Sequence, residues 1–400
     1  MEDEYNLKIM ASLKEKMDDY KSKLTDKYNR THSRSKRTIL AKELIYFSGL
    51  YRDIFGTDNK FDWDNDIKIY DNFDDKEIKE FKRFVEYTNE NNDFFYQLSK
   101  SVINSYDNVQ YPFYKYFTNK VLINPRLDRN TMINLMLSFL KSYDYDTFID
   151  MKDKIFNLEL LQLDFEALFS GLTYPISSLN KNFILLNNNF EDNLYKYSTI
   201  IHEYGHTYEM KLFQNSCNNI LLEKTLETPY FEVSSCFFEY AFLNYLKENK
   251  IYTTYVNHCL DNYYKEIITH FFQMNLISKF PDLEIEEDET IAFESKEIIK
   301  YGDKIKNRLN YYEFIEYDEP VDFRYPYIYG IGKLLSIYLY ENYKTNPNFF
   351  NEFNKSLLSY PLINDISAFC NLGITKEELL KGDTLRKVLK KHSKDFLNDV

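Results

Sequence analysis

Residues 202–206 read HEYGH, and this stretch decides how the rest of the chain is interpreted. Its two histidines are four positions apart, so on a helix they project from one face about one turn apart. Two imidazoles placed in this way can bind one Zn²⁺ ion, with Glu203 beside them as a general base. Only six of the 400 residues are histidine, so the motif has to be judged against its surroundings.

A third protein ligand is needed, because a catalytic zinc ion takes three and leaves the fourth position to water. Segment 231–239, FEVSSCFFE, is compatible with a helix on which Glu232, Ser235 and Glu239 share one face. A polar stripe on such an aromatic helix needs partners, which a metal ion and two imidazole N–H groups would supply. The downstream candidates for the third ligand are Glu223, Glu227, Glu232 and Glu239. We expect Glu232 to be the ligand, with Glu227 as its rival.

Long stretches of the chain contain no helix breaker, since Gly and Pro number only nine each. Apolar residues recur mostly every three and four positions, which predicts a mainly helical protein. The apolar run at 183–187, FILLN, is the best strand candidate. Thr228 and Pro229 are expected to begin the helix that carries Glu232. The expected helices are 4–28, 37–55, 74–105, 110–120, 130–169, 192–213, 228–248, 252–279, 292–306 and 330–343, with two more near the C-terminus.

A domain boundary is expected near residues 121–130, because Pro125 ends one helix and Asp128 or Asn130 caps the next. We therefore expect an N-terminal helical lobe over 1–124 and a metal-binding domain over 125–400.

The amino-acid composition argues against some classes of binding partner. The net charge of −13 argues against a nucleic-acid surface or an anionic-membrane surface. The acidic N-terminus lacks an apolar targeting segment, and no apolar run approaches membrane-spanning length. The four cysteines form no C-x-x-C pair and suit a reduced cytoplasm. We expect a cytoplasmic protein without nucleic-acid or membrane partners, and the composition leaves its oligomeric state open.

Residues outside the motif receive simpler interpretations. His258 and His270 lie on an expected core helix and are interpreted as structural, whereas His32 and His392 are expected at the surface. Cys236 is expected to be a small apolar packing residue. Gly205 is expected to let another backbone pack closely against the motif helix.

These motifs resemble those of the oligoendopeptidase F and thimet oligopeptidase family of zinc peptidases. HEYGH is followed, 26 residues after His206, by EVSSCFFE, as the family's H-E-x-G-H is followed by E-x-x-S-x-x-x-E. Gly171 and then FILLNNNFEDNLYKYSTIIHE look like the family's G…P-x-I-L-x-N…T-L-x-H-E. Segment 325–332, YPYIYGIG, resembles its Tyr-rich loop. The resemblance is specific over about 170–240 and 322–343.

The resemblance implies a mainly α fold in which two lobes flank a substrate cleft and a small β-sheet lies beside the active site. It implies one Zn²⁺ per chain, with Glu203 as the general base that activates a zinc-bound water. Ser235 and Glu239 would orient the ligand imidazoles. The implied zinc ligands are His202, His206 and Glu232.

A peptide substrate is also implied by the resemblance. Tyr327 or Tyr329 would donate a hydrogen bond to the oxyanion, and Tyr325 would contact substrate. The strand at 183–187 would pair with an extended peptide through its edge. Its implied substrate-contacting residues are Phe183, Ile184 and Leu185.

The chain departs from the family in two ways. Its N-terminal lobe is shorter, and the region before the Tyr-rich segment, YDEPVDFR at 317–324, lacks the histidine that the family carries there. Arg324 or Tyr325 could replace it. We expect a zinc endopeptidase that acts on oligopeptides. The alternatives are a zinc metallocarboxypeptidase of the helical Taq type, whose H-E-S-Q sequence is absent here, and a catalytically silent, zinc-stabilised peptide-binding protein.

Overall fold

The computed structural model describes residues 2–55, 75–109, 111, 127–157, 159–163, 171–176, 179, 181–187, 193–216, 225, 227–279 and 324–399. Within these ranges the chain forms helices and one three-stranded sheet, which confirms the mainly helical fold. It divides into two compact units: unit 1 comprises Met1–Asn72 with Leu140–Phe190, and unit 2 comprises Phe73–Phe139 with Glu191–Val400. This division differs from the expected lobes of 1–124 and 125–400, because the segment that carries the sheet groups with the first two helices.

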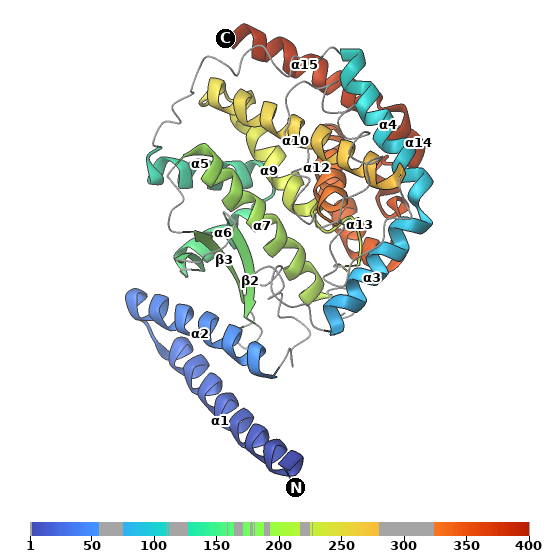
Figure 1. The fold of residues 1–400 in the computed structure, drawn as a ribbon. Coiled ribbons are helices and arrows are strands. Elements are labelled where there is room, and N and C mark those ends of the chain that lie inside the picture. The colour runs from blue at the N-terminus through green and yellow to red at the C-terminus, as the bar shows by residue number, and fades with distance from the viewer. Residues whose placement is uncertain are drawn as a thin grey trace, which may run out of the picture. The chain divides into compact units, whose positions relative to one another are not determined.

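Unit 1 is built from a helix pair and the sheet. Helices α1 (Glu2–Arg30) and α2 (Arg34–Phe55) pack against each other (Figure 1). Helix α6 (Tyr145–Phe156) precedes the strands β1 (Leu160–Leu163), β2 (Gly171–Ile176) and β3 (Lys181–Asn187). Apolar side chains of α1 and α2 form one core cluster with side chains of all three strands. Burial of this shared apolar surface holds the unit together.

Strand β3 is the central strand of the sheet, whose order is β1-β3-β2. It pairs with β1 in parallel, with Leu160 opposite Ile184, and with β2 antiparallel, with Tyr174 opposite Phe183. The prediction that β3 offers an edge to a peptide is therefore wrong, because β1 and β2 lie on its two sides. Its side chains Phe183, Ile184 and Leu185 are at most 1% exposed, as expected for an apolar run inside a sheet.

Two strands were not predicted. Residues 160–163 fall within the expected helix 130–169, and no element was predicted for residues 171–176, which contain Gly171 and Pro175. In the described sheet β2 is an outer strand that pairs only with β3. Proline has no backbone N–H to donate, and it is tolerated in such a strand because one side of the strand forms no hydrogen-bond ladder.

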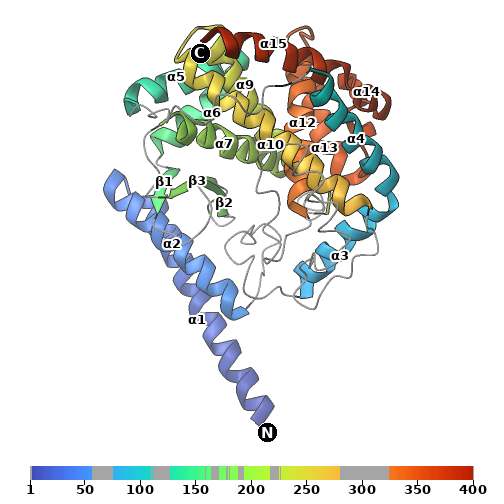
Figure 2. The same ribbon diagram turned by 45° about the horizontal axis from the view of Figure 1, so that its top comes forward.

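Unit 2 is helical in its described part. At its centre, helix α9 (Val233–Glu248) contacts α7 (Leu194–Asn215), α10 (Thr253–Lys279) and α12 (Arg324–Tyr343), and these helices lie side by side in Figures 1 and 2. Helix α9 is apolar on nearly every side, which is the pattern of a fully buried helix. None of the described helices is long and apolar enough to cross a membrane. The helices are α3 (Asp75–Glu90), α4 (Asn92–Val109), α5 (Arg129–Tyr143, ending in unit 1), α7 (Leu194–Asn215), α9 (Val233–Glu248), α10 (Thr253–Lys279), α12 (Arg324–Tyr343), α13 (Phe349–Ile363), the 3₁₀ helix η3 (Ile366–Leu372), α14 (Lys376–Lys381) and α15 (Asp383–Asp399).

Three local expectations for unit 2 need correction. Helix α9 begins at Val233 instead of at Pro229, because residues 227–232 form turns and Thr228 Oγ1 accepts a bond from the Tyr230 N–H at 3.2 Å. The Tyr-rich segment is the start of helix α12 and is not a loop. His392 is 2% exposed and stacks on Tyr111, so it is not a surface residue. The expected helix 292–306 and most of 110–120 lie outside the described residues.

Candidate metal centre

Two glycines allow three helices of unit 2 to meet without intervening side chains. A β-carbon on Gly205 of α7 would lie 2.5 Å from Ser235 Cα of α9, and one on Gly332 of α12 would lie 2.8 Å from the Glu232 carbonyl oxygen. Ser234 Oγ also donates a hydrogen bond of 3.0 Å to the Gly205 carbonyl oxygen. The expected close approach at Gly205 is therefore present, and the partner is the helix that follows Glu232.

The three predicted metal ligands converge on one point. Nε2 of His202 lies 3.1 Å from Glu232 Oε2, and Nε2 of His206 lies 3.2 Å from the same oxygen. The two imidazole rings are 5.2 Å apart and nearly perpendicular, at 81°. All three side chains are buried or nearly so. Two nitrogen donors and one carboxylate oxygen directed at one position are the donor set that catalytic zinc sites use.

Neighbouring polar groups hold two of these side chains in place. Ser235 Oγ donates a 2.6 Å hydrogen bond to Glu232 Oε2, and His202 Nδ1 lies 3.2 Å from Glu239 Oε2. A carboxylate behind a ligand imidazole fixes its tautomer and its orientation. The His206 ring is held by stacking on Phe231 at 5.0 Å, and its buried Nδ1 has no hydrogen-bond partner among the described residues.

The charges of this cluster change the pKa values of its members. Burial alone would lower the pKa of His202, but the hydrogen bonds and charges of Glu232 and Glu239 outweigh burial and raise it to about 10. Burial would raise the pKa of Glu232, whereas the two histidines hold it well below its usual value. The cluster thus stabilises positive charge at the imidazoles, and a cation bound there would have to displace the proton of His202.

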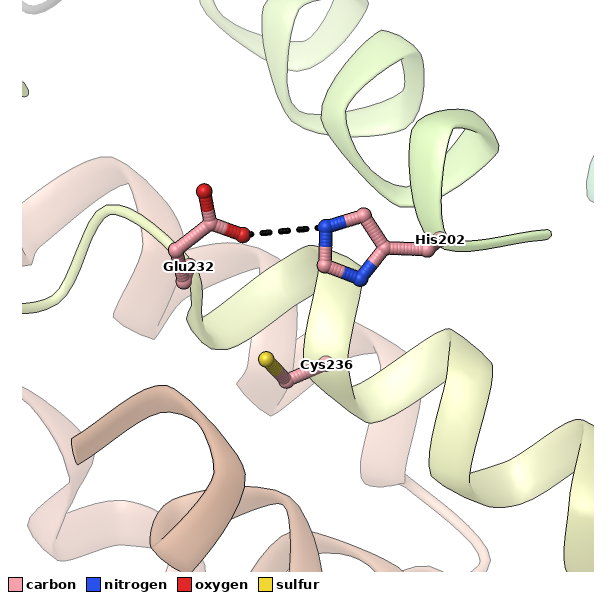
Figure 3. A group of neighbouring side chains, drawn as sticks. All are labelled: His202, Glu232 and Cys236. Atoms are coloured by element: carbon pink, nitrogen blue, oxygen red, sulfur yellow. Dashed lines mark ion pairs between the residues drawn. The ribbon is translucent and has the colours of Figure 1, made fainter. Parts of the chain in front are cut away.

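Cys236 brings a sulfur atom to the same place. One donor atom each of His202, Glu232 and Cys236 lie within 4.8 Å of one another. Figure 3 shows His202 on α7, Glu232 and Cys236 at the start of α9, and the ion pair between Glu232 and His202. His206 is not a member of this group, although its Nε2 contacts the Glu232 oxygen that also contacts His202.

Glu203 follows His202 directly and is 6% exposed. Its negative charge contributes to raising the pKa of His206, so its carboxylate lies close to that ligand. A carboxylate beside the ligands, without being one of them, can accept a proton from a molecule bound at the centre.

Of the three tyrosines in segment 325–332 of α12, Tyr327 lies apart from Tyr325 and Tyr329. Residues two apart on a helix point about 200° away from each other, whereas residues four apart share a face. Tyr327 is 1% exposed, its hydroxyl pairs with Ser278 at 3.1 Å, and it therefore lies in the core and is not presented to the ligands. Tyr325 and Tyr329 have ring centroids 4.4 Å apart and both contact His270.

Tyr325 lies within the electrostatic reach of the predicted ligand Glu232. Burial of its hydroxyl, followed by the charge of Glu232, raises the pKa of Tyr325 to about 12. Its side chain is nevertheless half-exposed. His270, interpreted from the sequence as structural, lies against this tyrosine, and burial together with Lys333 lowers the pKa of His270 to about 3. The uncharged imidazole and the two phenol rings form an aromatic group beside the centre.

Sequence reasoning missed two buried charged groups near the ligands. Lys333 pairs with Glu266 at 2.6 Å and contributes to lowering the pKa of Glu239. A lysine alone within the apolar stretch 330–340 was the signal that could have identified it. Glu209, one turn after His206, accepts a 2.5 Å hydrogen bond from Tyr360, and no spacing in the sequence links these two residues.

Comparison with known proteins gives a likeness of fold. Neither a family model nor a curated protein matches the sequence. The structure is similar to that of a protein assigned as a peptidase from Chlamydophila abortus, with a TM-score of 0.53 and 12% identity over 97% of this chain and 63% of that one. The chain thus spans less than two thirds of that protein's length.

Two further solved structures are similar at lower scores. An oligoendopeptidase F from Bacillus anthracis has a TM-score of 0.47 and 11% identity over 92% of this chain and 64% of that one. PZ peptidase A, solved with an inhibitor, has a TM-score of 0.46 and 12% identity over 92% of this chain and 66% of that one. The likeness to the Chlamydophila abortus structure shows that this chain shares its fold.

Proposed function

We propose that the protein is a zinc-dependent endopeptidase that hydrolyses oligopeptides. The observation that carries the proposal is the convergence of His202 Nε2 and His206 Nε2 on Glu232 Oε2, at 3.1 and 3.2 Å. A histidine–histidine–carboxylate set is the one that zinc peptidases use. Support comes from the fold, which is similar to that of a protein assigned as a peptidase.

Each residue of the centre would have its own role in peptide hydrolysis. His202, His206 and Glu232 would hold the zinc ion, which when bound lowers the pKa of a water molecule toward neutrality. Glu203 would be the general base beside these ligands, able to hold a proton and to pass it to the leaving amine. Glu239 and Ser235 keep His202 and Glu232 oriented through the contacts described above.

Tyr325 is the tyrosine best placed to assist. Its hydroxyl lies within the electrostatic reach of Glu232, and its pKa of about 12 keeps it protonated at neutral pH. A protonated phenol can donate a hydrogen bond to the oxygen that becomes negative as the peptide bond is attacked. Tyr329 packs on Tyr325 and positions its ring.

The test is the digestion of a mixed peptide library by the zinc-loaded protein, with the products identified by mass. Internal cuts are expected; loss of single C-terminal residues would instead indicate a metallocarboxypeptidase. Glu203→Gln should lower turnover by about 10² to 10⁴-fold while leaving the zinc stoichiometry unchanged. Glu232→Ala should lose zinc. Absence of zinc-dependent turnover in the unmodified protein, with no effect of Glu203→Gln, would reject both enzymatic functions.

A further inference from the structure

Helix α15 is held against unit 2 by one face only. It contacts α4, α10 and α12, and Figures 1 and 2 show it along the outer side of these helices. Its side chains Leu385, Leu389 and His392 are at most 2% exposed. Because these buried side chains fix the rotation of the helix about its axis, the opposite face is held toward solvent.

The solvent-facing side of α15 carries a row of lysines. Their spacing of three and four residues places them on one side of the helix. Together with Asp383 and Arg386 they line an open hollow of about 500 Å³. The row consists of four exposed residues, Lys387, Lys390, Lys391 and Lys394, to which we refer as the lysine row.

The charge of the lysine row is not neutralised within the described part of the chain. The two acidic residues beside it are engaged by other groups, since Asp383 pairs with Arg386 and Asp395 pairs with Lys247 of α9 at 2.9 Å. No described carboxylate forms an ion pair with the row itself. Like charges three and four residues apart on a helix repel each other. The row therefore costs stability, and a bound anion would remove that cost.

The positive charge of the lysine row is local. The chain as a whole has a net charge of −13, and at physiological ionic strength surface charges act over only about 8 Å. From its first to its last residue the row extends about 10 Å along the helix axis. A long nucleic acid or an anionic membrane would extend well beyond the row and meet a surface of the opposite charge balance. A short anionic segment would fit within the row.

The arrangement of the lysines also favours a chain of anionic groups over a single small anion. Neighbouring positions of the row are about 5 to 6 Å apart at their β-carbons and follow the helix axis. One phosphate ion would therefore contact only part of the row. A polypeptide with several successive carboxylates can place one beside each ammonium group, because lysine side chains are long and flexible.

We propose that the lysine row is a docking surface for a short acidic polypeptide segment of a partner protein. Exposed ion pairs of this kind accelerate association and make it dependent on salt. The proposal is independent of the proposed function, because no residue of the row belongs to the candidate metal centre. Loss of the row should therefore leave peptide hydrolysis unchanged.

The direct test is fluorescence anisotropy of a labelled peptide of about eight glutamates, titrated with the full-length protein. Binding should weaken by about tenfold or more between about 50 and 300 mM NaCl. Replacing all four lysines of the row by Gln should lower the affinity by about tenfold or more, whereas replacing all four by Arg should keep it within about threefold, because Arg preserves the charge.

A second quadruple variant controls for the change in overall charge. It removes the same number of positive charges from exposed positions of α1 and α2 in unit 1, and it should bind the glutamate peptide as the wild type does. Gln is a good helix former, so both Gln variants should keep the wild-type circular dichroism spectrum. The control carries Lys16→Gln, Lys23→Gln, Lys27→Gln and Lys36→Gln.

Three results would overturn the proposal. The first is a wild-type protein that does not bind the glutamate peptide at about 50 mM NaCl. The second is an equal loss of affinity in the two Gln variants, which would show that only the overall charge matters. The third is tighter binding of a DNA duplex or of phosphatidylserine vesicles than of the glutamate peptide, with the same dependence on the row, which would assign the surface to a different partner.

Discussion

Gly205 and Ser235 are in direct backbone contact, and a β-carbon on Gly205 would lie 2.5 Å from Ser235 Cα. This contact brings together the helix of the two histidines and the helix that follows Glu232. Real β-carbon atoms essentially never come this close to another atom. Any residue other than glycine at position 205 would therefore force the two backbones to shift. The separation of the three metal donors therefore depends on the absence of a side chain at position 205.

Gly205→Ala should destabilise the protein by about 1 to 3 kcal/mol, because the added methyl group forces two backbones apart in a close-packed interior. Metal affinity should fall as well, since the donors sit on the separated helices. Thermal unfolding and zinc titration measure the two effects. Gly49→Ala on α2 is the control: its added β-carbon meets no atom within 4 Å, so stability should rise by about 0.5 to 1 kcal/mol. Equal melting of Gly205→Ala and wild type would contradict the role of this contact.

Glu239→Gln should weaken zinc binding by about 10 to 100-fold, because an amide replaces the carboxylate that faces His202 Nδ1 at 3.2 Å. The fold should persist, since Gln has nearly the same size. Zinc affinity is measured by competition with a chelator. Glu248→Gln at the other end of α9, where the carboxylate is half-exposed and pairs with Lys344, should leave the affinity unchanged. If both variants bind zinc alike, Glu239 does not orient the ligand.

The affinity for zinc should rise with pH across the neutral range. The folded, metal-free protein holds the pKa of His202 at about 10, above the usual 6.5, so a proton has to leave this imidazole when a cation binds. The proton stabilises the metal-free fold below about pH 6.5, and this contribution is lost as pH rises through about 10. Release of the His202 proton alone predicts about a tenfold gain in zinc affinity per pH unit between about pH 6.5 and 9, and release of a proton from His206, whose pKa is also raised, makes the slope steeper. Chelator competition at several pH values measures the slope, and a flat profile would contradict the pKa assigned to His202.

Glu209→Gln should stabilise the metal-free protein at mildly alkaline pH. Burial raises the pKa of Glu209 to about 8, although the Tyr360 hydrogen bond lowers it in part. A carboxyl whose pKa is higher in the folded protein than in the unfolded chain costs stability as pH rises from about 4.5 to about 8. The neutral amide removes that cost. Denaturant unfolding at about pH 5 and about pH 9 should show the variant gaining on the wild type only at the higher pH, and an equal difference at both would contradict the prediction.

Much of the fold could be anticipated because helical periodicity is local. The scarcity of Gly and Pro and the three-and-four spacing of apolar residues predicted most of the described helices, and 183–187 was identified as a strand. Strands β1 and β2 were missed because four and six residues carry little periodic signal, and because the parallel partner of β1 lies further along the chain, with Leu160 opposite Ile184. The start of α9 at Val233 was missed because the turns before it depend on packing that no local pattern records.

At the candidate centre, the spacing of the motifs was enough to predict which residues could act together. HEYGH and the E-x-x-S-x-x-x-E spacing follow the repeat of a helix, so they identified His202, His206, Glu232 and the two residues that contact them. The other groups near these ligands could be identified from the folded chain alone. It placed Tyr327 in the core and Tyr325 near Glu232, put β3 inside the sheet, and brought Cys236, Lys333 and Glu209 to the ligands. The spacing of residues along a helix specifies only which residues share a face. What packs against that face depends on how closely two backbones can approach each other. At Gly205 and Gly332 the neighbouring backbone is closer than a β-carbon would allow.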